Sequence, residues 1–256
     1  MNVLRNKNTR ILMLIMCILV FITVTFLYFY YRKINSFVDP RILEARVLYG
    51  KYNTYAERNE LDSALILMDS IEHLYQNVIH YKNSFELGVI LNNSAAAYIT
   101  SAFLMDSIPG NSSAQDSLMI LAEEQLLRSI DIYNQWMTTF QDKSKEDIKN
   151  IISEDFLTGL DEYDEEQRLN YLTNRIDEIY NSQREIKRRL SVSYTNLGVI
   201  CRHKEQFEKA ALHYKKAIDL WDRNLTAENN LNILLGRPLK KRNMLQKLFP
   251  PDKDEN

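Results

Sequence analysis

The stretch that decides the fold is Tyr194–Trp221, which reads YTNLGVICRHKEQFEKAALHYKKAIDLW. Three small residues in it, Gly198, Ala210 and Ala217, allow two helices to approach each other closely. Larger residues at intervening positions fill the seam between the helices; they are Tyr194, Leu197, Cys201, Phe207 and Tyr214. The stretch therefore predicts a tightly packed pair of helices.

The order of these residue types resembles the tetratricopeptide repeat (TPR), a unit of about 34 residues made of two antiparallel helices. An aromatic residue and a Leu-Gly pair come first, followed by Ala, an aromatic residue and a second Ala. Cys201 is a departure, because a tyrosine is usual at its place. Such repeats are binding scaffolds far more often than enzymes, so the resemblance implies a protein that binds other proteins.

The composition of the 256-residue chain favours helices throughout. Only six glycines and five prolines are present, so strand and turn signals are scarce. The net charge of −2 gives no overall field that points to nucleic acid. Cys17 lies in an apolar run and Cys201 in the repeat, so a disulfide between them is not expected and cysteine usage does not indicate the compartment.

A transmembrane helix is predicted at residues 11–31, after a short flank at residues 1–10. The segment reads ILMLIMCILVFITVTFLYFYY, carries no charge and has the length that a bilayer-spanning helix needs. Its aromatic end is typical of a membrane interface. A cleaved secretory signal is the alternative, but the apolar run is too long and no Ala-x-Ala-like site follows it. We therefore expect a single-pass anchor.

The side of the membrane on which the remaining chain lies follows less directly. Positive residues flank both ends of the apolar run, with Arg5, Lys7 and Arg10 on one side and Arg32, Lys33, Arg41 and Arg46 on the other. Because the N-terminal flank is short and the remainder is large, we expect a bacterial inner-membrane protein with its C-terminal domain in the periplasm. A domain that faces the cytoplasm, as on an outer-mitochondrial anchor, is the alternative.

Residues 41–236 are predicted to form an α-solenoid of about three TPR-like helix pairs. With the last pair at 191–224, two imperfect copies fall near 45–78 and 88–136. In the first copy Tyr52 takes the small-residue place, where a bulky side chain is expected to push the helices apart. In the second copy Ala95 takes the place of Gly198, and a loop at Met105–Ser117 separates the two helices.

Two further helical segments complete the predicted domain. An insertion at 138–186 contains a short helix, and from Glu165 onward an apolar period continues to Gly198 with no proline or glycine, which predicts one long helix. Residues 226–235 resemble the capping helix that closes such arrays. Residues 237–256 form a basic tail that is expected to be disordered, or alternatively to contact anionic lipid or an acidic partner.

No pattern in the chain predicts catalysis. The four histidines, His73, His80, His203 and His213, are not accompanied by a CxxC, HExxH or carboxylate cluster. No glycine-rich phosphate loop or GxSxG elbow is present. We expect no enzyme activity, catalytic residue, cofactor, metal or small-molecule substrate.

The resemblance also implies where a partner binds, because the first helix of each repeat lines a concave groove. The corresponding residues here are Tyr49, Asn53, Asn92, Asn93, Ala96, Thr195, Asn196, Val199 and Arg202. The basic residues that hold C-terminal carboxylates in some family members are not matched as a set. The expected partner is therefore a protein or peptide whose identity the sequence does not give.

Two functions are consistent with this organisation. One is a membrane-anchored scaffold that binds a peptide or a partner subunit in its groove. The alternative is an accessory subunit of an envelope secretion or assembly machinery that acts through its basic tail and long helix at the lipid surface.

Overall fold

The computed structural model describes residues 7–35, 37–105 and 112–242, and side chains within 11–28, 37–105 and 112–242. Over these ranges the chain is all-helical, as predicted, with no strand. The helices are α1 Lys7–Asn35, α2 Leu43–Glu57, α3 Leu61–Asn77, α4 Phe85–Met105, α5 Ser112–Phe140, α6 Lys145–Leu157, α7 Glu165–Ser182, α8 Ile186–His203, α9 Phe207–Leu220 and α10 Leu225–Leu234. Single 3-10 turns lie at Pro40–Ile42 and Ile79–Tyr81. Residues 1–6 of the predicted flank at 1–10, the centre of the predicted loop, and residues 243–256 of the predicted tail lie outside the described residues.

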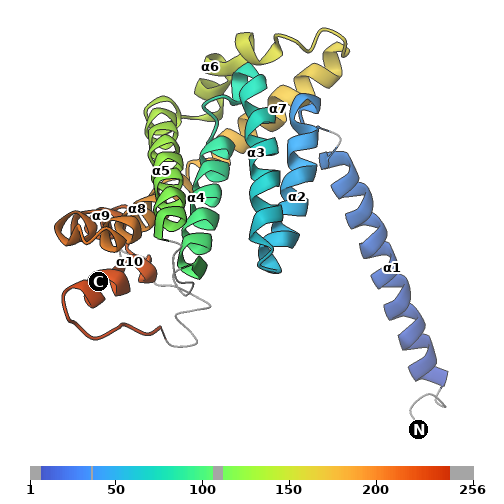
Figure 1. Ribbon diagram of the computed structural model, residues 1–256. Coiled ribbons are helices and arrows are strands. Elements are labelled where there is room, and N and C mark those ends of the chain that lie inside the picture. Colours follow the sequence, from blue (N-terminus) through green and yellow to red (C-terminus); the bar gives the residue numbers. More distant parts are fainter. Residues whose placement is uncertain (1–6, 36, 106–111, 243–256) are drawn as a thin grey trace.

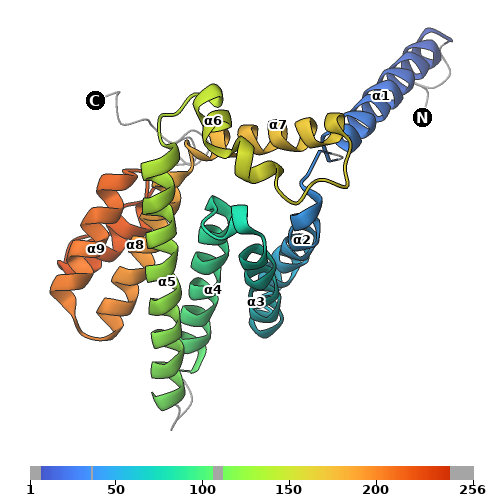
Figure 2. The ribbon, with the colours of Figure 1, turned by 90° about the horizontal axis from the view of Figure 1, so that it is seen from above.

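Six of the helices form three neighbouring pairs, α2 with α3, α4 with α5 and α8 with α9 (Figure 1). Adjacent pairs are joined by packing of α3 on α4 and of α5 on α8, while α10 packs on α9. The inserted helices α6 and α7 lie across one end of this stack, where α2 and α4 begin (Figure 2). The insertion therefore covers an end of the helix pairs.

The turns of the first and third pairs have the same geometry. Asn59 and Glu205 occupy the left-handed region, with φ of 59° and 58°. The next residue's amide closes each turn: Glu60 N donates to Tyr55 O at 2.9 Å, and Gln206 N donates to Cys201 O at 2.8 Å. This hydrogen bond back across the helix end is the C-terminal capping pattern of the Schellman motif. The alignment of the first copy with the last therefore has a structural counterpart at its turn.

A tyrosine ring packs directly on a glycine in both the second and the third pairs. A Cβ atom added to Gly198 would lie 2.4 Å from the Tyr214 ring, and one added to Gly88 would lie 2.5 Å from the Tyr133 ring. These distances are far below van der Waals contact, so only glycine fits. The counterpart of Gly198 in the second pair is therefore Gly88, two helical turns before the expected Ala95. Since seven residues make almost two full turns, Ala95 lies on the same face of α4.

The long helix expected from Glu165 to Gly198 is wrong, because the chain breaks between α7 and α8. At the break Arg184 N donates to Asn181 O at 3.3 Å and Glu185 N donates to Ser182 O at 3.0 Å, which are tight 3-10-type contacts. The change of direction places α7 across the stack, so that α8 can pack on α5 and α9. The apolar period runs through this bend without a glycine or proline to mark it.

Helix α1 stands apart from the helical body (Figure 1). Its Ile11–Tyr28 window has a mean hydropathy of 2.8, and none of it is buried against the rest of the protein. The structure thus contains an N-terminal helix that is long and apolar enough to span a membrane. Helix α4 passes the same test of length and composition, but 61% of it is buried, which makes it the core helix of the stack.

Candidate binding surface

The first helices of the three pairs, α2, α4 and α8, carry all the residues expected to bind a partner. Between α2 and α4, the Asn93 amide donates to the Tyr49 hydroxyl at 3.4 Å. The Tyr49 ring in turn stacks on Tyr52, with ring centroids 5.5 Å apart. Tyr52 is half-buried beside Tyr49, and α2 and α3 still pack along their length.

A buried polar network joins α4 to α8. The Asn92 Oδ1 atom accepts hydrogen bonds from Ser193 Oγ at 3.0 Å and from Asn196 Nδ2 at 3.4 Å. Ser129 of α5 lies 3.5 Å from Ser193 and donates to the Gly88 carbonyl at 2.8 Å. Asn92 is only 4% exposed. The expectation that Asn92 faces a partner is therefore corrected: its side chain is used to hold neighbouring helices together.

Thr195 is also buried rather than facing a groove. Its hydroxyl donates to Ser191 O at 2.8 Å and accepts from Asn224 Nδ2 at 2.9 Å. Asn224 also donates to the Ser191 hydroxyl at 2.8 Å, and its Oδ1 accepts from Ala227 N at 3.0 Å, which caps α10. Thr195 therefore contributes to the junction of α8 with α10, and the sequence missed Asn224 as the residue that makes this junction.

The remaining expected residues form a partly exposed surface along α2, α4 and α8, which we call the α2–α4–α8 strip. Its members are Tyr49, Asn53, Asn93, Ala96, Asn196, Val199 and Arg202. Asn53 is exposed and the others are half-buried, so each retains contact with solvent. Arg202 Nη1 donates to Asn230 Oδ1 of α10 at 3.5 Å. Hydrogen bonds of Asn93 with Tyr49 and of Asn196 with the buried Asn92 connect the three helices that carry the strip.

A cluster of charged residues fixes α7 to the starts of α2 and α4. The buried guanidinium of Arg175 donates to both carboxylate oxygens of Glu86, at 2.7 and 3.4 Å, and to Glu178 at 3.2 Å. It also lies 4.4 Å from the centroid of the Tyr81 ring. Arg46 of α2 completes the cluster through an ion pair with Glu178. Sequence reasoning missed this cluster, because only Arg175 and Glu178 are close in the chain.

The electrostatics of the cluster favour its ionised form. Burial acts to raise the pKa of Glu86, but the Arg175 charge and hydrogen bonds outweigh it and hold that pKa below 4.5. Burial likewise acts to lower the pKa of Arg175, and the neighbouring carboxylates and Tyr81 reverse the effect and raise this pKa well above its usual value. Glu86 and Arg175 therefore remain a charged pair at neutral pH.

The histidines lie in separate environments. Helix α3 ends at Asn77, so His80 lies in the following 3-10 turn and does not share a helix face with His73. His80 packs on Phe156 with ring centroids 5.7 Å apart, and burial together with the Arg41 charge lowers its pKa. Within 7–35, 37–105 and 112–242, no group of three or more His, Cys, Asp or Glu residues is placed to hold a metal.

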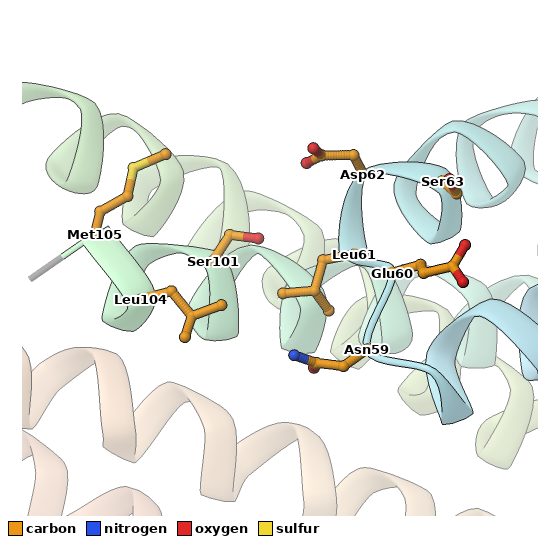
Figure 3. Close-up of a pocket in the computed structure, with 8 residues that line it drawn as sticks. All are labelled: Asn59, Glu60, Leu61, Asp62, Ser63, Ser101, Leu104 and Met105. Carbon is orange, nitrogen blue, oxygen red and sulfur yellow. The ribbon is translucent and has the colours of Figure 1, made fainter.

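A hollow of 490 Å³ lies where the α2–α3 turn faces the end of α4. Figure 3 shows Asn59 and Leu61 extending toward Ser101 and Leu104, while Glu60 extends away. Its lining contains the acidic residues Glu60 and Asp62 and the apolar residues Leu61, Leu104 and Met105. The hollow therefore offers acidic and apolar surface.

Comparisons with known proteins assign no relative. No protein-family model, curated protein or solved structure matches this chain. The function therefore has to follow from the geometry of the chain itself.

Proposed function

We propose that this protein is a membrane-anchored scaffold of TPR-like helix pairs that binds a peptide or a partner subunit. The binding face is the α2–α4–α8 strip, α1 is the anchor, and the body performs no catalysis. The observation that carries the proposal is that side chains from three sequence-distant helices meet at this partly exposed face, through the Asn93–Tyr49 and Asn196–Asn92 hydrogen bonds. The chain also carries an apolar helix that is not buried against the rest of the protein.

Two features support a binding role for this face. The polar contacts behind the strip, made by Asn92, Ser193 and Thr195, fix the spacing of its helices, and a preformed surface loses little entropy on binding. Amide and aromatic groups such as Asn93, Asn196 and Tyr49 can hydrogen-bond a peptide backbone while they contact apolar side chains. The same face contains no set of groups arranged as nucleophile and base.

The partner test uses full-length protein purified in detergent from its own membranes after crosslinking. The binding variant combines Asn196→Ala with Arg202→Glu. The control is Lys215→Glu, which makes the same change of charge at an exposed position of α9 outside the strip. The proposal expects a crosslinked partner to be lost only in the binding variant. Retention in the binding variant together with loss after truncation at Gly236 would favour the accessory-subunit alternative and overturn the groove proposal.

We further propose that α1 is a retained anchor with the helical body on the periplasmic side of a bacterial inner membrane. Protease added to intact spheroplasts is expected to degrade the body, and the same body in inverted vesicles is expected to be protected. The opposite pattern would place the body in the cytoplasm. Release of the protein by carbonate washing would show instead that α1 does not span the bilayer.

A further inference from the structure

A second cavity, of 210 Å³, lies among α2, α3, α4 and α8. Its walls are mostly apolar and aromatic, and are formed by Tyr49, Tyr75, Phe85 and Val89. Two charged residues, Glu86 and Arg189, complete it. Tyr49, Glu86 and Arg189 keep partial exposure, so the cavity is accessible from solvent. For comparison, an apolar cavity of about 150 Å³ accommodates benzene, so this one has room for a single ring or branched side chain.

The Arg189 guanidinium in this cavity makes no side-chain hydrogen bond or ion pair within the part of the chain that the structure describes, although its charge acts on the buried Tyr133 hydroxyl. Its Nε atom is buried and makes no hydrogen bond, and the side chain forms no ion pair there. The adjacent Arg188 is the contrast, because it pairs with Glu185 at 2.5 Å. Because no carboxylate of the described residues pairs with this guanidinium, its N–H donors at the cavity wall remain available to an acceptor that enters the cavity.

The charge around the cavity also favours an anion. Glu86 is already engaged by Arg175, and Glu178 by Arg46 and Arg175. The charges of Arg46 and Arg175 balance those of Glu86 and Glu178. Arg189 therefore adds one positive charge that no carboxylate of this group balances. In a partly desolvated site this excess charge stabilises a carboxylate more strongly than water-exposed charge does.

The position of the cavity connects it with the proposed binding face. When α4 and α8 are aligned on Gly88 and Gly198, Phe85, Glu86 and Val89 occupy the places of Thr195, Asn196 and Val199. Glu86 and Val89 are thus the α4 equivalents of two members of the strip, Asn196 and Val199, while Phe85 is the equivalent of the buried Thr195. The alignment expected from the sequence, which placed Ala95 opposite Gly198, does not bring these positions together.

We infer that this cavity, the Arg189 pocket, binds one carboxylate that a partner peptide carries beside an apolar side chain. The carboxylate pairs with Arg189, and the apolar side chain packs among the rings of Tyr75 and Phe85. The inference rests on the proposed function, since it names the chemistry of a peptide bound on the same face. It requires no covalent step.

The test titrates full-length protein in detergent with acetyl-Asp-Phe-amide and with its uncharged isostere acetyl-Asn-Phe-amide, followed by calorimetry. The acidic peptide is expected to bind at least about tenfold more tightly than the isostere, because its hydrogen bond with Arg189 is charge-assisted. Arg189→Gln is expected to abolish that preference, while the matched neighbour variant Arg188→Gln retains it. Equal binding of the two peptides, or an unchanged preference in Arg189→Gln, would overturn the inference.

Two controls separate this inference from its alternatives. Because the Arg189 side chain makes no hydrogen bond or ion pair among the described residues, Arg189→Gln is expected to unfold at no lower a denaturant concentration than the wild type, so that lost binding is not lost folding. Saturable binding of 3-phenylpropanoate without binding of the acidic peptide would indicate a small-molecule site and refute the peptide assignment. If the crosslinked partner depends on the strip but the acidic peptide does not compete with it, the scaffold proposal stands and the Arg189 pocket fails.

Discussion

The α4–α5 and α8–α9 pairs share a contact but differ in almost everything around it. In both, a tyrosine ring packs on a glycine of the facing helix. Helices α4 and α5 have 21 and 29 residues, and α6 and α7 cover their end, whereas α8 and α9 have 18 and 14 residues and are closed by a short turn. Tyr133 belongs to the main core, and Tyr214 to a small one with Cys201 and Ala210. The same glycine–tyrosine contact therefore occurs in helix pairs of very different length.

Removal of either tyrosine ring is expected to have the largest effect on stability in this comparison. Tyr133→Ala and Tyr214→Ala are each expected to lower the free energy of unfolding by about 3–5 kcal/mol, because both side chains are fully buried. Tyr133→Ala is expected to cost more, since its ring also packs near Phe85, at 5.7 Å between centroids. Urea unfolding in detergent, followed by circular dichroism, measures both. A larger loss for Tyr214→Ala would contradict the assignment of Tyr133 to the main core.

Adding one methyl group tests the contact itself. Gly88→Ala and Gly198→Ala are each expected to destabilise the protein by about 3 kcal/mol, because the new Cβ atom has no room beside the ring. Gly50→Ala on α2 is the control: nothing lies within 4 Å of its added Cβ, so it is expected to stabilise the helix by about 0.5–1 kcal/mol. If Gly88→Ala were as harmless as Gly50→Ala, the equivalence of Gly88 and Gly198 would be wrong.

The ionic contact at the start of α4, which has no counterpart at the start of α8, should give the α4–α5 pair a distinct pH dependence. Glu86→Gln is expected to cost about 2 kcal/mol at pH 7, since Arg175 then loses a charged partner in a largely buried site. The folded pKa of Glu86 lies below its ordinary 4.5, so this stability is present above 4.5 and is lost as pH falls through the folded pKa. The wild type and Glu86→Gln should therefore converge in acid-unfolding measurements below pH 4.5.

The control for this pH effect is Glu228→Gln, which removes an exposed ion pair with Lys240 beside the α8–α9 pair. It is expected to change stability by less than about 0.5 kcal/mol. A gap between Glu86→Gln and the wild type that persisted unchanged to low pH would show that lost packing, and not lost charge, causes the effect.

The smallest expected effect lies in the turns. Glu205→Gly is expected to stabilise the protein by about 1 kcal/mol, because glycine adopts a φ of 58° without strain. Asn59→Gly in the equivalent turn is expected to stabilise it less, since asparagine tolerates this region better than glutamate. Thermal unfolding of the two variants compares them. Destabilisation by Glu205→Gly would show that the Glu205 side chain has a role beyond the turn.

The sequence predicted the all-helical class and the turn of the first helix pair, but not the register of α4. Scarce glycine and proline predicted helices, and the turn before Phe207 allowed the turn before Leu61 to be aligned with it. The register of α4 was missed, because a shift of seven residues keeps the same helix face.

Other details were not accessible from the sequence. The bend after Ser182 has no local signal. The burial of Asn92 and Thr195 depends on partners about 30 to 100 residues away, at Asn224 and Ser193, which periodicity along one helix does not reveal.

The short segment that follows α1 has a mechanical consequence. The Arg41 guanidinium is held by Asp39 at 2.7 Å and donates to the carbonyls of Phe156 at 3.0 Å and Thr158 at 2.8 Å. The segment at which the chain enters the helical body is thus hydrogen-bonded to the C-terminal end of α6. A pulling force applied to the chain at Asp39 would therefore reach α6 through Arg41 before it reached the helix pairs.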